Sequence, residues 1–148
     1  MGDKIKFVVS SRRLAKEKTF DQPWAAIQVA TYDDWPNLNK VKNVGILRLT
    51  FSDANGKSDR DVPMVASDND IVLFSEKQAN CILDFFENVQ NKIEVLLVHC
   101  EAGVSRSPAI AAALSKLYYG DDTRFFANYT PNSFVYNSII KAYNKRNS

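Results

Sequence analysis

The chain has 148 residues, the length of one domain, and we therefore predict a single domain over residues 1–148. Hydrophobic residues make up 45% and charged residues 24% of the chain, which are the proportions of a globular protein and not of a disordered one. The formal net charge of +2 is too small to argue for nucleic acid or a membrane surface as partner, but it tolerates an anionic substrate.

We expect no targeting signal in the amino-terminal residues. The charged start MGDKIK has no apolar signal region behind it. No apolar run of the chain approaches the roughly 18 residues that are needed to span a bilayer. We therefore expect a cytoplasmic protein.

Three short apolar runs in the first third of the chain predict strands, at residues 7–9, 24–30 and 44–51. The polar and basic residues 10–20 between the first two predict a loop or a frayed helix. Residues 52–70 are dense in Asp, Asn, Gly and Ser and predict a long loop, which in a compact domain is usually functional or disordered.

The second half of the chain predicts helices around one buried strand. Ser75 has the character of an N-cap, and an apolar stripe over residues 79–89 indicates an amphipathic helix after it. The continuous apolar run 95–98 is typical of a strand that is buried on both faces. Residues 109–119, closed by Gly120, and residues 133–143 predict two more helices. This order of elements predicts an α/β fold.

The segment HCEAGVSRSP at residues 99–108 lies between the buried strand and a predicted helix. Such a turn directs backbone N–H groups and the positive end of a helix dipole at one point, which makes an anion site. Gly103 permits the tight turn and a close approach of a ligand. The same dipoles stabilise a thiolate at Cys100, and the planar fork of Arg106 can bind two phosphate oxygens. A buried cysteine is commonly only a small core residue, but these neighbours favour a nucleophile.

The string HCEAGVSRS resembles the signature of the protein tyrosine phosphatase superfamily, and in particular its dual-specificity branch. The segments LRLTFSD at 47–53 and PNSFVY at 131–136 resemble compact phosphatase-like proteins of bacteria and phages. The weaker likeness runs from about residue 24 to the end of the chain. The resemblance implies a single-domain fold of this superfamily, with a central, mostly parallel sheet flanked by helices.

The resemblance also implies roles for the residues of this segment. Cys100 would attack phosphorus and form a phosphocysteine, which water would then hydrolyse. Ser107 would donate a hydrogen bond to the sulfur of Cys100, and His99 would order the loop by a hydrogen bond. The phosphate oxygens would be held by the side chain of Arg106 and by the backbone of the loop residues Glu101, Ala102, Gly103, Val104 and Ser105. No metal or other cofactor is implied.

The general acid that protonates the leaving oxygen is less clear from the sequence. The usual spacing in dual-specificity members, about thirty residues before the nucleophile, points to Asp68 or Asp70. Their topology, in which the acid follows directly after a strand, points instead to Asp53. We favour Asp53, because a position after a strand determines location better than a residue count. Asp59 and Asp61 are poorer candidates.

Two further features have an ordinary interpretation. Trp35-Pro36 is similar to the start of the acid loop of larger tyrosine phosphatases, but Asn37 follows it, so we predict a turn. Cys81 lies on the predicted amphipathic helix, where packing is the favoured role. The alternative for Cys81 is a resolving partner for Cys100 under oxidation.

The substrate is the least determined property. The acidic Glu101 in the loop disfavours highly anionic lipid or RNA substrates, so we expect phosphorylated proteins or peptides, first of all phosphotyrosine and then phosphoserine or phosphothreonine. We expect a monomer. A pseudophosphatase that only binds phosphorylated partners is the main alternative, and a sulfurtransferase or arsenate reductase with related loop chemistry is a third.

Overall fold

The computed structural model describes residues 4–54 and 71–148 of the chain. Its secondary structure alternates strands and helices, and the elements in chain order are β1 (Lys6–Ser11), α1 (Arg12–Ala15), β2 (Trp24–Ala30), β3 (Asn43–Thr50), α2 (Glu76–Val89), β4 (Val95–Cys100), α3 (Arg106–Tyr119), α4 (Thr123–Asn128) and α5 (Ser133–Arg146). None of the helices in this part of the chain is long and apolar enough to cross a bilayer.

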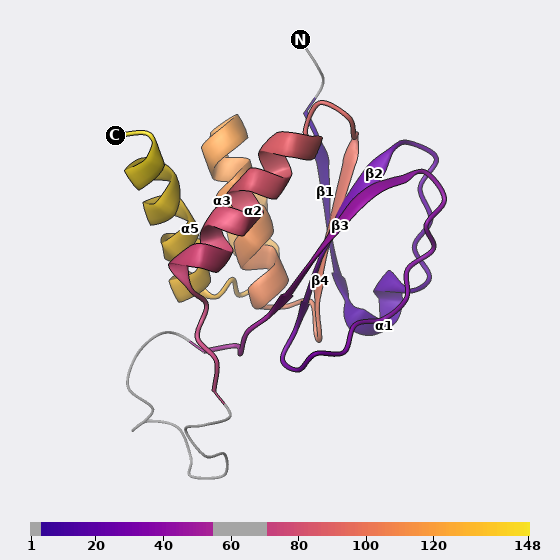
Figure 1. The fold of residues 1–148 in the computed structure, drawn as a ribbon, viewed down its shortest axis with the longest axis horizontal. Helices are drawn as coiled ribbons and strands as arrows, with labels where there is room; N and C mark the ends of the chain where they lie inside the picture. Colours follow the sequence, from indigo (N-terminus) through magenta and orange to yellow (C-terminus); the bar gives the residue numbers. More distant parts are fainter. Residues whose placement is uncertain (1–3, 55–70) are drawn as a thin grey trace.

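The four strands form one sheet in the order β1-β4-β2-β3, in which all three pairings are parallel (Figure 1). Every residue of the two central strands, β2 and β4, is buried. This confirms the predicted α/β fold with a parallel central sheet. Because the strands are parallel, their carboxyl ends lie at one edge of the sheet, and β4 ends there at Cys100.

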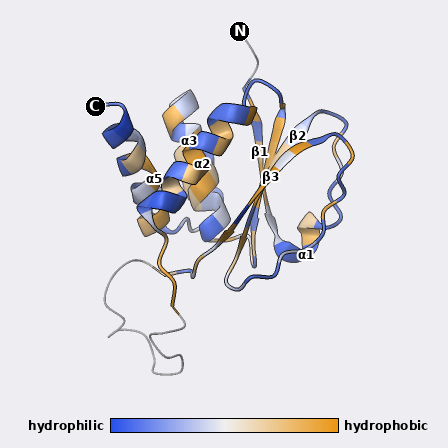
Figure 2. Ribbon diagram, viewed as in Figure 1, coloured by the Kyte–Doolittle hydropathy of each residue, from blue (hydrophilic) through white to orange (hydrophobic). Residues whose placement is uncertain are grey.

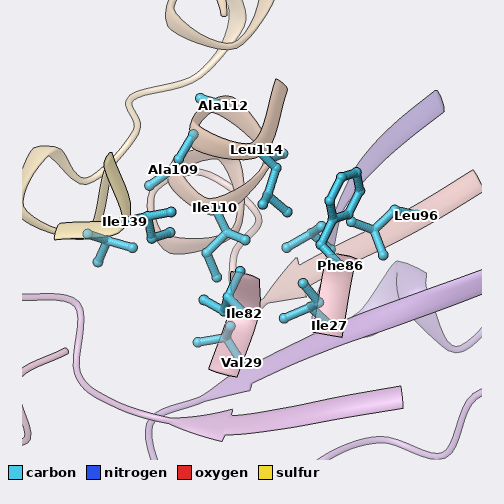
Figure 3. Close-up of a cluster of buried hydrophobic side chains, with 14 of the residues drawn as sticks. Ile27, Val29, Ile82, Phe86, Leu96, Ala109, Ile110, Ala112, Leu114 and Ile139 are labelled. Atoms are coloured by element: carbon cyan, nitrogen blue, oxygen red, sulfur yellow. The ribbon is translucent and has the colours of Figure 1, made fainter. Parts of the chain in front are cut away.

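Helices α2, α3 and α5 cover one face of the sheet, and α1 lies on the other (Figure 1). Alternate residues of β4 face the two sides: Leu96, Val98 and Cys100 belong to the helix-covered core, whereas Val95 and Leu97 belong to the smaller core on the other face. Figure 2 shows the hydrophobic residues on the strands and on the inner sides of these helices. Figure 3 shows the larger cluster, to which β2, β4, α2, α3 and α5 contribute the labelled side chains Ile27, Val29, Leu96, Ile82, Phe86, Ala109, Ile110, Ala112, Leu114 and Ile139.

The predicted helix ends are confirmed by their caps. Ser75 and Gln78 form a capping box at the start of α2, in which each side chain binds the backbone N–H of the other residue. Gly120 ends α3 in the left-handed conformation, with φ of 81°.

Besides small shifts at the ends of other elements, the structure differs from the sequence-based elements in three places. Strand β1 is longer than residues 7–9, because Ser10 and Ser11 continue its pairing with β4. Helix α3 begins at Arg106 rather than at Ala109, so its first turn carries the residues of the motif. Helix α4 was not predicted, since its six residues are too few to show a helical period. Of the predicted loop 52–70, residues 52–54 lie outside helices and strands, and residues 55–70 lie outside the described part.

Candidate active site

The loop between β4 and α3 folds around the sulfur of Cys100. The backbone N–H of Gly103 donates to Sγ over 3.2 Å, and Oγ of Ser107 lies 3.2 Å from the same sulfur. Cys100 is only 2% exposed. When the sulfur is a thiolate it has no proton to give, so the Ser107 hydroxyl is then the donor. Two hydrogen-bonding groups therefore converge on one buried sulfur, a few residues before a 14-residue helix.

The loop is held against the carboxyl end of β1 at Gly103. This residue has a φ of 75°, and a Cβ placed on it would come within 2.7 Å of the backbone of both Ser10 and Ser11. The N–H of Arg12 also donates to the carbonyl of Glu101 over 3.0 Å. Gly103 is thus required for both its conformation and its lack of a side chain.

Replacing Gly103 by alanine is expected to displace the loop, because the added Cβ meets backbone that cannot turn aside. We expect a loss of about 1–3 kcal/mol in the free energy of unfolding, the usual cost of strained backbone, together with a fall in phosphate affinity. Thermal unfolding and phosphate titration measure the two effects. Gly120→Ala is the matched control: Gly120 also has a positive φ, but no atom lies within 4 Å of its added Cβ. Equal phosphate affinity in both variants would contradict the proposed role of the loop.

Arg106 is 4% exposed, and both terminal nitrogens of its guanidinium donate hydrogen bonds. Its Nη1 donates to the carbonyl of Phe51 over 2.7 Å and to Oγ1 of Thr31 over 3.1 Å. Its Nη2 donates to Oε1 of Glu101 over 2.9 Å. Sequence reasoning assigned Glu101 only to substrate binding, and it did not identify Thr31. No local signal marks Thr31, since it follows a different strand.

The contacts of Glu101 also affect its titration. Partial burial raises the pKa of Glu101, but hydrogen bonds from Thr31 and Arg106 and the charge of Arg106 outweigh burial and hold this pKa below its usual range. The carboxylate therefore stabilises the fold above the usual pKa of a glutamate, and this contribution is lost as the pH falls through the lowered pKa.

Asp53 lies beside the loop, as its position after β3 predicted. Its Oδ1 accepts hydrogen bonds from Oγ of Ser105 and from Nδ2 of Asn132, each over 2.8 Å. The residue is exposed, and among the described residues Oδ2 of Asp53 has no partner. The alternative candidates Asp59, Asp61, Asp68 and Asp70 lie outside the described residues.

Asn132 connects this aspartate to the back of the loop, and sequence reasoning did not assign it a role. Its N–H donates to the carbonyl of Ser105 over 2.9 Å, and the neighbouring N–H of Thr130 donates to the carbonyl of Val104 over 3.0 Å. Its Oδ1 caps α5 by accepting from the N–H of Val135. The available signal was its place in the segment 131–136, part of the family resemblance.

His99 is buried beneath the loop and has polar partners on both ring nitrogens. Nδ1 lies 3.3 Å from the carbonyl of Cys100, and Nε2 lies 3.1 Å from Nε2 of Gln28. Because an amide nitrogen can only donate, Nε2 of His99 accepts, so Nδ1 carries the proton and donates to Cys100. Burial lowers the pKa of His99, which favours this neutral ring. The predicted hydrogen bond from His99 to the loop is therefore present.

The side-chain amide of Gln28 has two further hydrogen-bond partners. Its Nε2 also donates to the carbonyl of Pro36 over 2.9 Å, and its Oε1 accepts from Nε of Arg48 over 2.9 Å. Trp35 and Pro36 lie outside helices and strands, and no turn is assigned at the turn predicted there. The carbonyl of Pro36 binds the buried side-chain amide of Gln28.

A hollow of about 230 Å³ adjoins the loop and is lined by Arg12, Tyr32, Asp34 and Glu101. Arg12 pairs with Asp34 over 3.1 Å, and Tyr32 is 68% exposed. Within the loop, Glu101, Ala102 and Val104 are exposed, Ser105 is half-buried, and Gly103 and Ser107 are buried. The hollow therefore meets the loop at Glu101.

Neither cysteine is in a disulfide; Cys81 is half-buried on α2. In the described ranges, 4–54 and 71–148, no three His, Cys, Asp or Glu side chains gather as a metal site.

Comparisons with known proteins identify the fold. No protein-family model matches the sequence, and no curated protein is significantly similar to it. Among solved structures, the chain is similar to human DUSP28 (TM-score 0.64, 16% identity, 95% of this chain and 93% of that chain). It is also similar to a human tyrosine phosphatase-like serine/threonine/tyrosine-interacting protein (TM-score 0.63, 15% identity, 96% and 93%) and to PTPMT1 (TM-score 0.61, 13% identity, 96% and 94%). The chain thus has the fold of the dual-specificity phosphatases.

Proposed function

We propose that this protein is a cysteine-dependent phosphatase that hydrolyses phosphomonoesters through a phosphocysteine intermediate. The observation that carries the proposal is the buried Cys100 sulfur with its two donors, Gly103 and Ser107, in a loop that leads directly to the buried side chain of Arg106. A nucleophile, oriented amides and a bidentate cation are what phosphoryl transfer requires, because its catalysis is mainly positioning and charge stabilisation.

In the first step the thiolate of Cys100 forms a bond to phosphorus while the bond from phosphorus to the leaving oxygen breaks. Asp53 gives its proton to that oxygen from Oδ2, the carboxyl oxygen that has no other partner among the described residues. In the second step water attacks phosphorus, the sulfur–phosphorus bond breaks, and a proton of the water returns to Asp53. Ser107 donates to the sulfur as it leaves, and phosphate is released.

We infer that the substrates are phosphorylated proteins, with phosphotyrosine preferred. The hollow beside the loop supports this, because the exposed ring of Tyr32 on its wall can pack against an aromatic leaving group. The carboxylate of Glu101 on the same wall opposes additional phosphate groups on a substrate.

The test is hydrolysis of a generic aryl phosphate in the presence of a chelator. We expect turnover without added metal and competitive inhibition by vanadate, which resembles the trigonal arrangement of the transferred group. Binding of phosphate without any turnover would contradict the enzyme and support the pseudophosphatase alternative.

Asp53→Asn is expected to slow hydrolysis of phosphotyrosine by about 10²-fold or more, the usual contribution of general acid catalysis. The same variant should affect a substrate with a good leaving group much less, because such a group needs little help from a proton. The basic limb of the pH–rate profile should disappear as well. Steady-state rates on both substrates, compared with Asp68→Asn and Asp70→Asn, measure this. If Asp53→Asn leaves the phosphotyrosine rate unchanged while Asp68→Asn lowers it, the assignment is wrong.

A further inference from the structure

The hydrogen bonds of Arg106 use only part of its guanidinium. A guanidinium has five N–H groups in one plane. Both hydrogens of Nη1 have acceptors, the carbonyl of Phe51 and Oγ1 of Thr31, and one hydrogen of Nη2 is donated to Oε1 of Glu101. Three of the five groups are therefore occupied.

The two remaining N–H groups belong to Nε and Nη2 and lie parallel on one side edge of the guanidinium, the fork that binds two oxygens of a phosphate. Within the described residues neither has an acceptor. Asn43 Nδ2 is the only fully buried side-chain nitrogen or oxygen in that part of the chain that lacks a partner. Nε of Arg106 has no acceptor among the described residues and is not in that class, so its N–H is available to donate to an oxygen of a ligand.

Thr31 and Glu101, which bind the other edge of the Arg106 guanidinium, also bind each other. Oγ1 of Thr31 donates to Oε1 of Glu101 over 2.9 Å while it accepts from Arg106. Thr31 follows β2 and Glu101 follows β4, two strands that are neighbours in the sheet. Parallel pairing thus brings two acceptors, 70 residues apart in sequence, to one end of the guanidinium.

We propose that Thr31 and Glu101 are positioning residues that hold one edge of the Arg106 guanidinium, so that its Nε and Nη2 edge is presented to the phosphoryl group. This rests on the phosphatase function proposed above. In this proposal Glu101 does not compete with phosphate for Arg106, because the carboxylate and the phosphate bind different edges of the guanidinium.

Thr31→Val removes the hydroxyl with little change in size and is the first test. We expect the affinity for inorganic phosphate and the kcat on an aryl phosphate each to fall about tenfold, the effect of losing a hydrogen bond that orients a charged group. Thr31→Ser restores the hydroxyl and should recover both values. Thr19→Val, at an exposed position in the connection between α1 and β2, is the matched control and should match the wild type.

Glu101 provides the second test. Glu101→Gln keeps an acceptor oxygen and should retain phosphate affinity within about threefold, whereas Glu101→Ala should weaken it about tenfold. A carboxylate that competed with phosphate would give the reverse result, tighter phosphate binding in Glu101→Ala. That outcome, or a Thr31→Val variant with wild-type phosphate affinity and kcat, would overturn the proposal.

Calorimetric titration with inorganic phosphate separates this proposal from the proposed function. A wild-type protein that binds phosphate without hydrolysing an aryl phosphate contradicts the enzyme, whereas the affinities of the Thr31 and Glu101 variants still decide the orientation of Arg106. Thermal unfolding of each variant reports whether the chain is folded. If Glu101→Ala does not fold, the pair Thr31→Val and Thr31→Ser decides the result.

Discussion

Cys100→Ser is expected to abolish turnover, with a fall in kcat of about 10⁴-fold or more, the scale that follows removal of a catalytic nucleophile. The physical reason is that a serine hydroxyl keeps its proton under the same two donors that stabilise a thiolate, so no nucleophile forms. Phosphate should still bind, because the loop amides and Arg106 are unchanged. Steady-state kinetics on an aryl phosphate and calorimetric titration with phosphate measure the two quantities.

Cys81→Ser is the matched control for this variant, because Cys81 is half-buried on α2 and makes no contact in the site that we describe. It should keep wild-type kinetics. Turnover that survived Cys100→Ser and disappeared in Cys81→Ser would show that Cys81, and not Cys100, is the nucleophile. Turnover that survived both substitutions would exclude a cysteine nucleophile altogether.

Arg106→Lys is expected to lower kcat/KM by about 10²–10³-fold, although the charge is kept. An ammonium cannot present two parallel N–H groups to a phosphate. Its three N–H groups, if donated to the carbonyl of Phe51 and the side chains of Thr31 and Glu101, leave none for the phosphate. Unlike Cys100→Ser, this variant should lose phosphate affinity together with turnover.

Arg13→Lys, at an exposed position of α1, controls for a general effect of replacing arginine by lysine. Kinetics and phosphate titration of both variants give the comparison. Wild-type kcat/KM in Arg106→Lys would show that the positive charge alone suffices and that the guanidinium geometry has no part in the reaction.

The geometry of the segment around Cys100 was predictable because it is local. A buried strand, a turn with Gly103 and a helix follow one another within a few residues, so their own backbone hydrogen bonds bring Gly103 and Ser107 to the sulfur of Cys100. The position of Asp53 was also predictable, because the carboxyl ends of parallel strands share one edge. Its role as general acid stays a prediction.

The orientation of Arg106 was not predictable from local pattern. Its partner Thr31 lies 75 residues away in the sequence, and the contact of Asp53 with Asn132 joins residues 79 apart. Neither pair has a spacing that a helix or strand period would mark. The resemblance assigned the backbone of Glu101 to the phosphate, but it did not indicate that the carboxylate of Glu101 binds Arg106.

The sequence by itself thus determined the α/β class and the strand, turn and helix around Cys100, since each depends on residues that are neighbours along the chain. The tertiary structure decided which residues surround that loop. The strand order β1-β4-β2-β3 places β2 beside β4, so that Thr31 meets Glu101 one residue beyond each strand. Strand order results from packing of the whole core and not from the pattern of any one segment, which is why only the folded chain shows how Arg106 is held.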